Sequence, residues 1–214
     1  MITLFGAPGA GKTLQGQLLA KEYNWRWVSY RDLLLSLKDK DIKFAVEHGL
    51  FIDDKKATSL IRRTFVELHD FERGIFRSDW VNGGSTRQVI LDGFPGDYRQ
   101  VKWLIDNKEL KSLKGAIVLR VPRGELWRRL VERKRVDDTR ATIERRQDMY
   151  DRNITGMIRT LTMNGVLVRE VDGGNSPQDV LARIKDVLSD WGLVPEREYQ
   201  KIDKLPIIRV ISKN

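Results

Sequence analysis

Residues 6–13 have the composition and spacing of a phosphate-binding loop. They read Gly-Ala-Pro-Gly-Ala-Gly-Lys-Thr, which fits the pattern G-x-x-x-x-G-K-[ST]. Glycines let the backbone fold around a phosphate with its N–H groups pointing inward, and a helix that begins there adds the positive end of its dipole. The pattern predicts that Lys12 reaches the β- and γ-phosphates of a nucleotide and that the Thr13 hydroxyl binds Mg²⁺. The predicted nucleotide-binding residues here are Gly6, Gly9, Ala10, Gly11, Lys12 and Thr13.

A glycine-rich turn with an incidental lysine is the alternative interpretation of this segment. The flanking residues favour phosphate binding, because an apolar run over 2–5 comes directly before the loop and apolar residues at helical spacing follow over 13–23. A strand before the loop and a helix after it are the context that this motif requires.

Basic residues are concentrated between positions 128 and 146. A phosphoryl group in transfer spreads negative charge over its oxygens, and planar guanidinium groups neutralise that charge through charge-assisted hydrogen bonds. The alternative is a solvated basic helix face. We favour phosphate binding, because like charges at this density repel one another unless a polyanion or neighbouring acids offset them. The cluster comprises Arg128, Arg129, Arg133, Lys134, Arg135, Arg140, Arg145 and Arg146.

Short apolar runs alternate with amphipathic helical stretches along the chain, and these elements must position the residues above. This alternation is typical of an α/β fold with a parallel sheet covered by helices on both faces. The predicted strands are residues 2–5, 25–29, 88–91, 115–121 and 166–171. The string Ser-Pro-Gln-Asp at 176–179 predicts the start of a closing helix that ends near Trp191, because it offers an N-cap, a proline at the first helical position and an acid three residues after the cap.

The length and composition predict one globular domain over 1–214, with local excursions. Residues 30–70 are helical and charged without an evident strand, residues 72–87 have the composition of a loop, and the tail 192–214 includes an apolar run over 205–211. The tail can be an edge strand that covers the core or a partner-binding segment, and we favour the edge strand.

The net charge of +9 fits nucleic acid, a small polyanion such as a nucleotide, or a solvated basic surface, and charge alone does not choose among them. The chain has no cysteine and two histidines, so we expect any metal to be held by oxygen ligands. No apolar run approaches the ~20 residues that span a bilayer. We therefore expect a cytoplasmic protein that does not enter a membrane. We do not expect nucleic acid as its partner, because charge alone supports that interpretation.

The phosphate loop, together with Leu91-Asp92-Gly93-Phe94-Pro95, resembles adenylate kinases and the wider nucleoside monophosphate kinase family from residue 1 to about 188. This resemblance implies a P-loop NTPase three-layer sandwich that acts as a monomer on ATP, a nucleoside monophosphate and Mg²⁺. It places Asp92 near the Mg²⁺, although a plain Asp-Gly turn after a strand is an open alternative. It stacks Arg129 on the ATP adenine, assigns a short lid to 132–138 with an acidic pair at Asp137 and Asp138, and implies phosphate-binding catalytic roles for Arg133, Arg135 and Arg146.

The acceptor side departs from the family pattern. The family string S-T-G-D-L-L-R aligns with Ser29–Leu35, so Tyr30 replaces a threonine and Leu35 replaces an arginine that grips the monophosphate. A second such arginine is replaced by Gly96, whereas Gln100 matches the glutamine that reads the acceptor adenine. The resemblance carries acceptor binding to Tyr30, Gly93 and Gln100. Other cations can supply the lost charges, but we interpret each as a surface residue: Arg31, Lys38, Lys43, Arg62, Arg63 and Arg99.

The resemblance favours phosphoryl transfer from Mg-ATP to a nucleoside monophosphate, and the retained Gln100 favours AMP. Two alternatives stay open because Leu35 and Gly96 stand at the arginine positions. One is an ATP-dependent kinase with a different acceptor, and the other is a non-catalytic regulatory protein that binds ATP.

Overall fold

The computed structural model describes residues 1–48, 50, 52, 59–60, 62–66, 88–135 and 137–195. The predictions for the 72–87 loop, for most of residues 49–58 and for residues 196–214 of the tail lie outside these ranges. Within the described residues, no helix combines the length and the apolar character that crossing a membrane requires.

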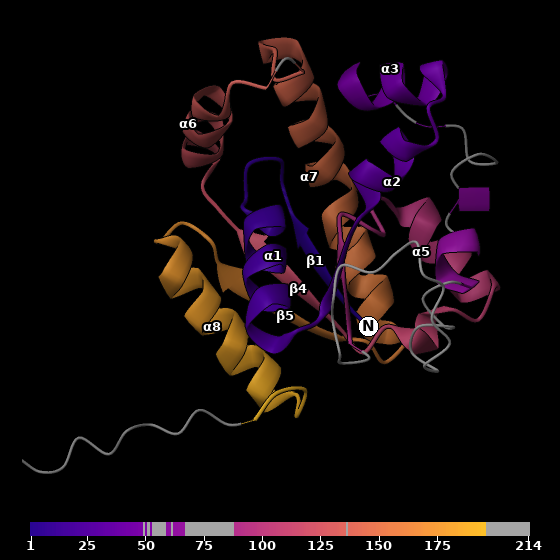
Figure 1. Cartoon of the computed structure of the whole chain (residues 1–214), viewed down its shortest axis with the longest axis vertical. Helices are drawn as coiled ribbons and strands as arrows, with labels where there is room; N and C mark the ends of the chain where they lie inside the picture. Colours follow the sequence, from indigo (N-terminus) through magenta and orange to yellow (C-terminus); the bar gives the residue numbers. More distant parts are fainter. Residues whose placement is uncertain are drawn as a thin grey trace, which may run out of the picture.

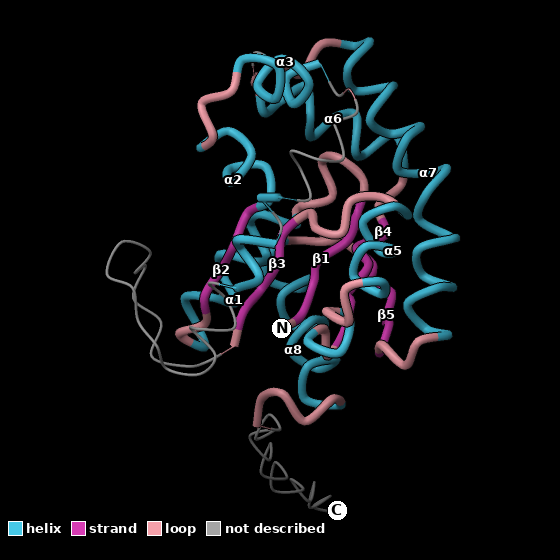
Figure 2. The backbone as a smooth tube through the Cα atoms, turned by 90° about the vertical axis from the view of Figure 1, so that its right-hand side faces the viewer, coloured by secondary structure: helices cyan, strands magenta, loops and turns pink. Residues whose placement is uncertain are grey.

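A five-stranded parallel sheet forms the centre of the molecule (Figure 1). Its strands are β1 (Ile2–Gly6), β2 (Arg26–Ser29), β3 (Val89–Asp92), β4 (Gly115–Arg120) and β5 (Leu167–Asp172). They lie side by side in the order β2-β3-β1-β4-β5, as Figure 2 shows from the side. All five predicted strands are confirmed, with ends that shift by at most one residue. The second begins at Arg26 because the Trp25 N–H donates to Ala20 O and still belongs to the end of the preceding helix.

Helices cover both faces of the sheet. On one face, α1 (Lys12–Tyr23) contacts β1, β2 and β3 and packs against α8 (Pro177–Asp190). On the other face, α7 (Arg140–Met163) contacts β5 and packs against α5 (Tyr98–Asp106), which is followed by the short 3₁₀ helix η2 (Leu110–Ser112). The predicted closing helix is α8, and the Ser176 side chain accepts a hydrogen bond from the Asp179 N–H at its start.

The two hydrophobic cores lie on opposite faces of the sheet because side chains alternate along each strand. Leu4, Ile90 and Ile117 belong to the core beneath α1 and α8. Phe5, Leu91 and Val118 directly follow them in sequence and belong to the core beneath α5 and α7. The three central strands, β3, β1 and β4, are therefore buried on both faces, as expected for a parallel sheet. The α/β three-layer sandwich is confirmed.

Three further helices lie at the edge of the sheet where the chain crosses between strands. Between β2 and β3 the chain forms α2 (Tyr30–Ser36) and α3 (Lys40–His48). Between β4 and α7 it forms α6 (Arg123–Arg133). In Figure 1, α3 and the α6–α7 turn both lie at the top of the molecule, above the carboxyl ends of the strands. In a parallel sheet this edge is where ligands bind.

Candidate active site

The phosphate loop connects β1 to α1 and depends on glycine at two positions. Gly9 has φ 86° and Gly11, the N-cap of α1, has φ 93°, and both values lie in the left-handed region that favours glycine. A Cβ at Gly9 would also lie 3.0 Å from the carbonyl oxygen of Leu126 in α6. The glycines therefore allow the loop both to turn and to pack closely against α6.

Lys12 folds back onto the loop. Its Nζ donates hydrogen bonds to Gly6 O at 2.7 Å and Ala7 O at 3.1 Å. Burial lowers the pKa of this lysine, the charge of Asp92 acts in the opposite direction, and the charge of Arg133 lowers it further. A partly buried ammonium with neutral carbonyl partners gains stabilisation when an anion enters the site.

Thr13, in the first turn of α1, meets Asp92, the last residue of β3. The Thr13 hydroxyl donates a hydrogen bond of 2.7 Å to Oδ2 of Asp92. Among the described residues, no three side chains of the His, Asp or Glu type gather as a metal cage. This donor set fits Mg²⁺ that arrives with phosphates, because Mg²⁺ keeps several waters and takes one or two protein oxygens in such sites.

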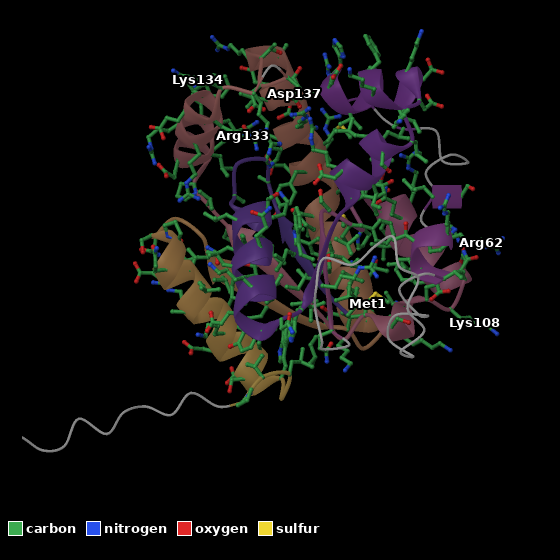
Figure 3. All side chains as sticks on the ribbon, viewed as in Figure 1. Met1, Arg62, Lys108, Arg133, Lys134 and Asp137 are labelled. Atoms are coloured by element: carbon green, nitrogen blue, oxygen red, sulfur yellow. The ribbon has the colours of Figure 1, made fainter. Side chains whose placement is uncertain are left out.

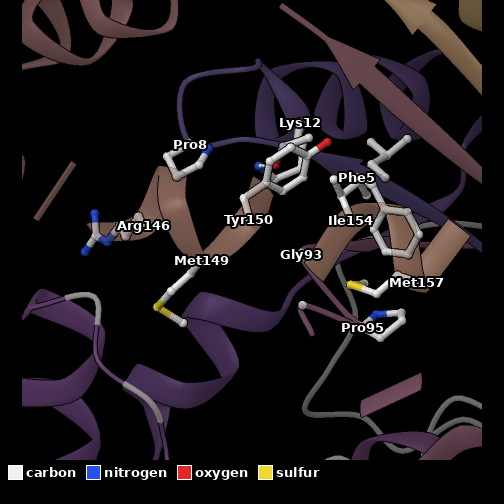
Figure 4. A pocket seen from close by; sticks show the side chains of 13 residues that line it. Phe5, Pro8, Lys12, Gly93, Pro95, Arg146, Met149, Tyr150, Ile154 and Met157 are labelled. Atoms are coloured by element: carbon white, nitrogen blue, oxygen red, sulfur yellow. Dashed lines mark hydrogen bonds between the residues drawn. The ribbon is translucent and has the colours of Figure 1, made fainter. Parts of the chain in front are cut away.

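A cavity of about 510 Å³, the main cavity, opens beside this pair. It brings together many of the residues that the sequence predicted, from the loop, from β3 and from the arginine cluster. The predicted residues that line it are Gly9, Gly11, Lys12, Thr13, Tyr30, Asp92, Gly93, Arg129, Arg133, Arg135 and Arg146. Lys12, Gly93 and Arg146 also line an adjoining, smaller cavity against α7, shown from close by in Figure 4, and Gly6 lines that smaller cavity with them.

Two arginines of the main cavity, Arg133 and Arg146, are held by the acidic pair between α6 and α7. Arg133 donates two hydrogen bonds, of 2.8 and 2.7 Å, to Asp138. Arg146 donates to Asp137 over 2.7 Å. Figure 3 shows Arg133 and Asp137 close together at the turn between the two helices. Burial and the charges of Arg133 and Arg31 lower the pKa of Arg135. The positive charge of this cluster is thus only partly offset by the chain itself.

Arg129 links the main cavity to a second cavity of about 470 Å³ between α6 and the start of α8. Its Nε donates to Glu125 over 2.7 Å, which fixes the guanidinium plane at the border of the two cavities. The opposite wall of the second cavity includes residues 173–176, which link β5 to α8, and Pro177 and Val180 of α8. The sequence analysis missed this wall. The pair Gly173-Gly174 after a strand was the available signal.

Of the predicted acceptor residues, Tyr30 and Gly93 line the main cavity, whereas Gln100 contacts Tyr30 from outside it. The Gln100 side chain donates from Nε2 to the Tyr30 hydroxyl over 3.3 Å and accepts from the Gly96 N–H over 2.6 Å. Tyr30 lines the main cavity, whereas Gln100 is not among its lining residues. Leu35 packs against the hydrophobic core. Both polar ends of Gln100 therefore have partners within the chain.

Of the cations that the sequence analysis interpreted as surface residues, Arg31 lies elsewhere. It lines the main cavity, and its Nη2 is 2.9 Å from Oδ2 of Asp137. Arg62, which lies far from Arg133 in Figure 3, is exposed, as are Arg63, Lys38 and Lys43. Arg99 pairs with Asp97 at its own helix start. The surface interpretation was wrong for Arg31.

The chain is similar in sequence to one protein-family profile and to several proteins that share one name. A protein-family profile described as an AAA domain matches residues 2–150. A protein named adenylate kinase from Leptospira biflexa is 30% identical over 185 residues, which are 84% of this chain and 94% of the relative. A protein named adenylate kinase from Leifsonia xyli is 29% identical, and the match covers 90% of this chain and 94% of the relative. One of the same name from Thermus thermophilus is also 29% identical, and that match covers 87% of this chain and 96% of the relative.

Proposed function

Since this chain belongs to the adenylate kinase family and is a phosphotransferase of that kind, we propose that it transfers the γ-phosphoryl group of Mg-ATP to AMP, giving two ADP. We place this reaction in the cytoplasm and assign it to a monomer. The observation that supports it best is the convergence of Lys12, Arg133, Arg135 and Arg146 on one cavity beside the Thr13–Asp92 pair.

ATP binds over the phosphate loop and in the second cavity. Its adenine lies in the second cavity against the guanidinium of Arg129, which Glu125 holds in one orientation. Its phosphates extend over the loop to Lys12. The Lys12 ammonium then exchanges the carbonyl oxygens of Gly6 and Ala7 for phosphate oxygens, and this exchange supplies the buried charge with an anionic partner.

The acceptor monophosphate takes the main cavity on the side of Tyr30 and Gly93. An oxygen of its phosphate attacks the γ-phosphorus in line, a new P–O bond forms, and the bond from the γ-phosphorus to the bridging oxygen breaks so that ADP leaves. Arg133, Arg135 and Arg146 neutralise the charge that develops on the transferred group and hold both nucleotides in line. The protein supplies no nucleophile.

Thr13 and Asp92 would hold the Mg²⁺ of the nucleotide, Thr13 through its hydroxyl and Asp92 directly or through waters. Bound there, Mg²⁺ would supply positive charge that stabilises the negative charge of the transferred group. The short lid at 132–138 closes over the nucleotides, and exclusion of water from the cleft suppresses hydrolysis of ATP.

A coupled assay of ADP production tests this proposal. Mg-ATP is combined separately with AMP, CMP, UMP, GMP and dAMP, and Lys12→Ala serves as the control. We expect AMP-dependent turnover that falls by roughly 100-fold or more in the control. Tight ATP binding without turnover on any monophosphate would remove the proposal and leave a regulatory nucleotide-binding protein.

A second candidate acceptor is a monophosphate other than AMP. The Tyr30–Gln100 hydrogen bond favours it, because Tyr30 occupies a position where the family has a smaller threonine and ties the amide that would read adenine. The same assay decides between the two, since the second candidate requires a higher kcat/KM with CMP, UMP, GMP or dAMP than with AMP.

A further inference from the structure

We propose that Arg31 binds the phosphate of the acceptor, at the place that the carboxylate of Asp137 occupies in this structure. This inference rests on the proposed function, since it assigns one residue to the acceptor of that reaction. It gives Arg31 a role as a specificity-determining residue for substrates that carry a monophosphate.

The position of Arg31 is fixed by the first turn of α2. Ser29 is the N-cap of this helix, and its side chain accepts a hydrogen bond from the Asp32 N–H. Leu33 and Leu34 of the same turn are buried in the core. The helix is therefore anchored, and the Arg31 side chain extends from its outer side across the main cavity to the turn between α6 and α7, with 33% of its surface exposed.

Two guanidinium groups converge on one carboxylate oxygen. Oδ2 of Asp137 lies 2.9 Å from Nη2 of Arg31 and 2.7 Å from Nη2 of Arg146, and the Asp137 side chain is only 8% exposed. Burial tends to raise the pKa of Asp137, but the hydrogen bond from Arg146 and the charges of Arg31 and Arg146 outweigh it and lower that pKa. The arrangement is that of an anion site that the chain fills with its own carboxylate.

A phosphate monoester suits this site better than the carboxylate does. It offers three terminal oxygens and close to two negative charges, so it can accept from Arg31 and Arg146 together and still leave an oxygen toward Lys12. Lys12 and Arg146 line the same cavity as Arg31, so all three surround one volume. The phosphate can enter only when the carboxylate of Asp137 moves away from the two guanidinium groups.

The acceptor side offers few other cations for this task. Within residues 30–48, Lys38, Lys40 and Lys43 are exposed, and Arg31 is the cation that lines the main cavity. Leu35 is apolar and packed, and Gly96 has no side chain. A monophosphate on this side therefore has Arg31 as the nearest guanidinium that α2 provides.

A purely structural cross-link between α2 and the lid is the competing explanation of the Arg31–Asp137 pair. The two explanations predict opposite results for Asp137→Asn. If the pair only holds the two segments together, Arg31→Ala and Asp137→Asn have the same effect on the acceptor KM. If Asp137 competes with the acceptor phosphate, Arg31→Ala raises the acceptor KM and Asp137→Asn lowers it.

The experiment measures KM for AMP and for ATP in wild type, Arg31→Ala, Arg31→Lys and Asp137→Asn, with Lys43→Ala as a control for loss of an exposed cation. We expect the AMP KM to rise by roughly 10- to 100-fold in Arg31→Ala, with an intermediate rise in Arg31→Lys, because a hydrogen bond to a charged group is lost. We expect the ATP KM to change less than about threefold, since the ATP phosphates lie on Lys12 and the loop. Lys43→Ala should match wild type.

Calorimetric binding of AMP and of adenosine separates this inference from the proposed function. Adenosine lacks the phosphate, so Arg31→Ala should weaken binding of AMP and leave binding of adenosine unchanged. An AMP affinity and AMP KM within about twofold of wild type, or an equal loss for adenosine, would overturn the role of Arg31 while transfer by the wild type persists. Absence of transfer by the wild type with every monophosphate would instead remove the proposed function.

Discussion

Thr13 and Asp92 are 79 residues apart in sequence, and the hydroxyl of the first donates to the carboxylate of the second over 2.7 Å. Thr13 lies in the first turn of α1, and Asp92 is the last residue of β3. The register of the sheet fixes this meeting, because Asp92 pairs with Leu4 of β1 and so reaches the same edge as the phosphate loop. Two oxygen donors are therefore held together before a nucleotide binds, which lowers the cost of organising a cation there.

Asp92→Asn should weaken Mg²⁺ use without disrupting the fold. An asparagine keeps an oxygen that accepts from Thr13 but removes the charge, so we expect kcat to fall by roughly 10- to 100-fold and the Mg²⁺ requirement to rise. ADP production measured against Mg²⁺ concentration checks this. Asp106→Asn removes an exposed carboxylate that pairs with Lys102 and is the matched control. An unchanged Mg²⁺ dependence would exclude Asp92 from the cation site.

Lys12→Met should abolish transfer and stabilise the protein. The wild-type ammonium is partly buried against neutral carbonyls and its pKa is lowered, mainly by burial, so an apolar side chain of similar length removes a desolvation cost. We expect a gain of about 1 kcal/mol in the free energy of unfolding, together with loss of activity. Urea unfolding measures the first and the coupled assay the second. A clear loss of stability would show that Lys12 contributes to the fold as well as to the chemistry.

Sequence reasoning succeeded where local chemistry decides structure. Residues 2–5 are an apolar run that ends at a glycine-rich loop, and glycines at this spacing favour a turn, so β1 and the start of α1 could be predicted directly. The capping string before Pro177 likewise fixes the beginning of α8, because Ser176 satisfies the Asp179 N–H.

It failed where the direction of a long side chain depends on a distant segment. Arg31 stands beside Asp32 on a polar part of α2, and nothing local distinguishes it from Lys38 or Lys43. Its role follows only from the position of Asp137, which another part of the chain supplies. The Tyr30–Gln100 hydrogen bond joins residues 70 apart and was equally out of reach. Such contacts between distant segments leave no periodic pattern in the sequence.

Two glycine substitutions should change stability in opposite directions. Gly156 lies within α7, and a Cβ there would meet nothing within 4 Å, so Gly156→Ala should stabilise by about 0.5–1 kcal/mol through helix propensity. Gly115 begins β4, and a Cβ there would lie 2.3–2.9 Å from the ring of Trp191, so Gly115→Ala should cost about 1–3 kcal/mol. Urea unfolding of both variants checks the pair. A neutral Gly115→Ala would mean that the Trp191 ring moves aside without loss of packing.

The ion pairs of Asp137 with Arg31 and Arg146 should make part of the free energy of unfolding depend on pH. The pKa of Asp137 is lowered in the folded protein, so its contribution is fully present above the ordinary value of 3.8 and is lost as the pH falls toward the lowered folded value. At pH 7, Asp137→Asn should therefore destabilise by about 1–3 kcal/mol, because Arg31 and Arg146 lose a charged partner. The difference between wild type and variant should shrink as the pH falls below 3.8, which thermal unfolding at a series of pH values measures. Asp106→Asn, which breaks an exposed pair, should cost less than about 0.5 kcal/mol. A difference between wild type and Asp137→Asn that stays constant down to the lowest pH at which both fold would mean that the ionised carboxylate does not hold the two arginines.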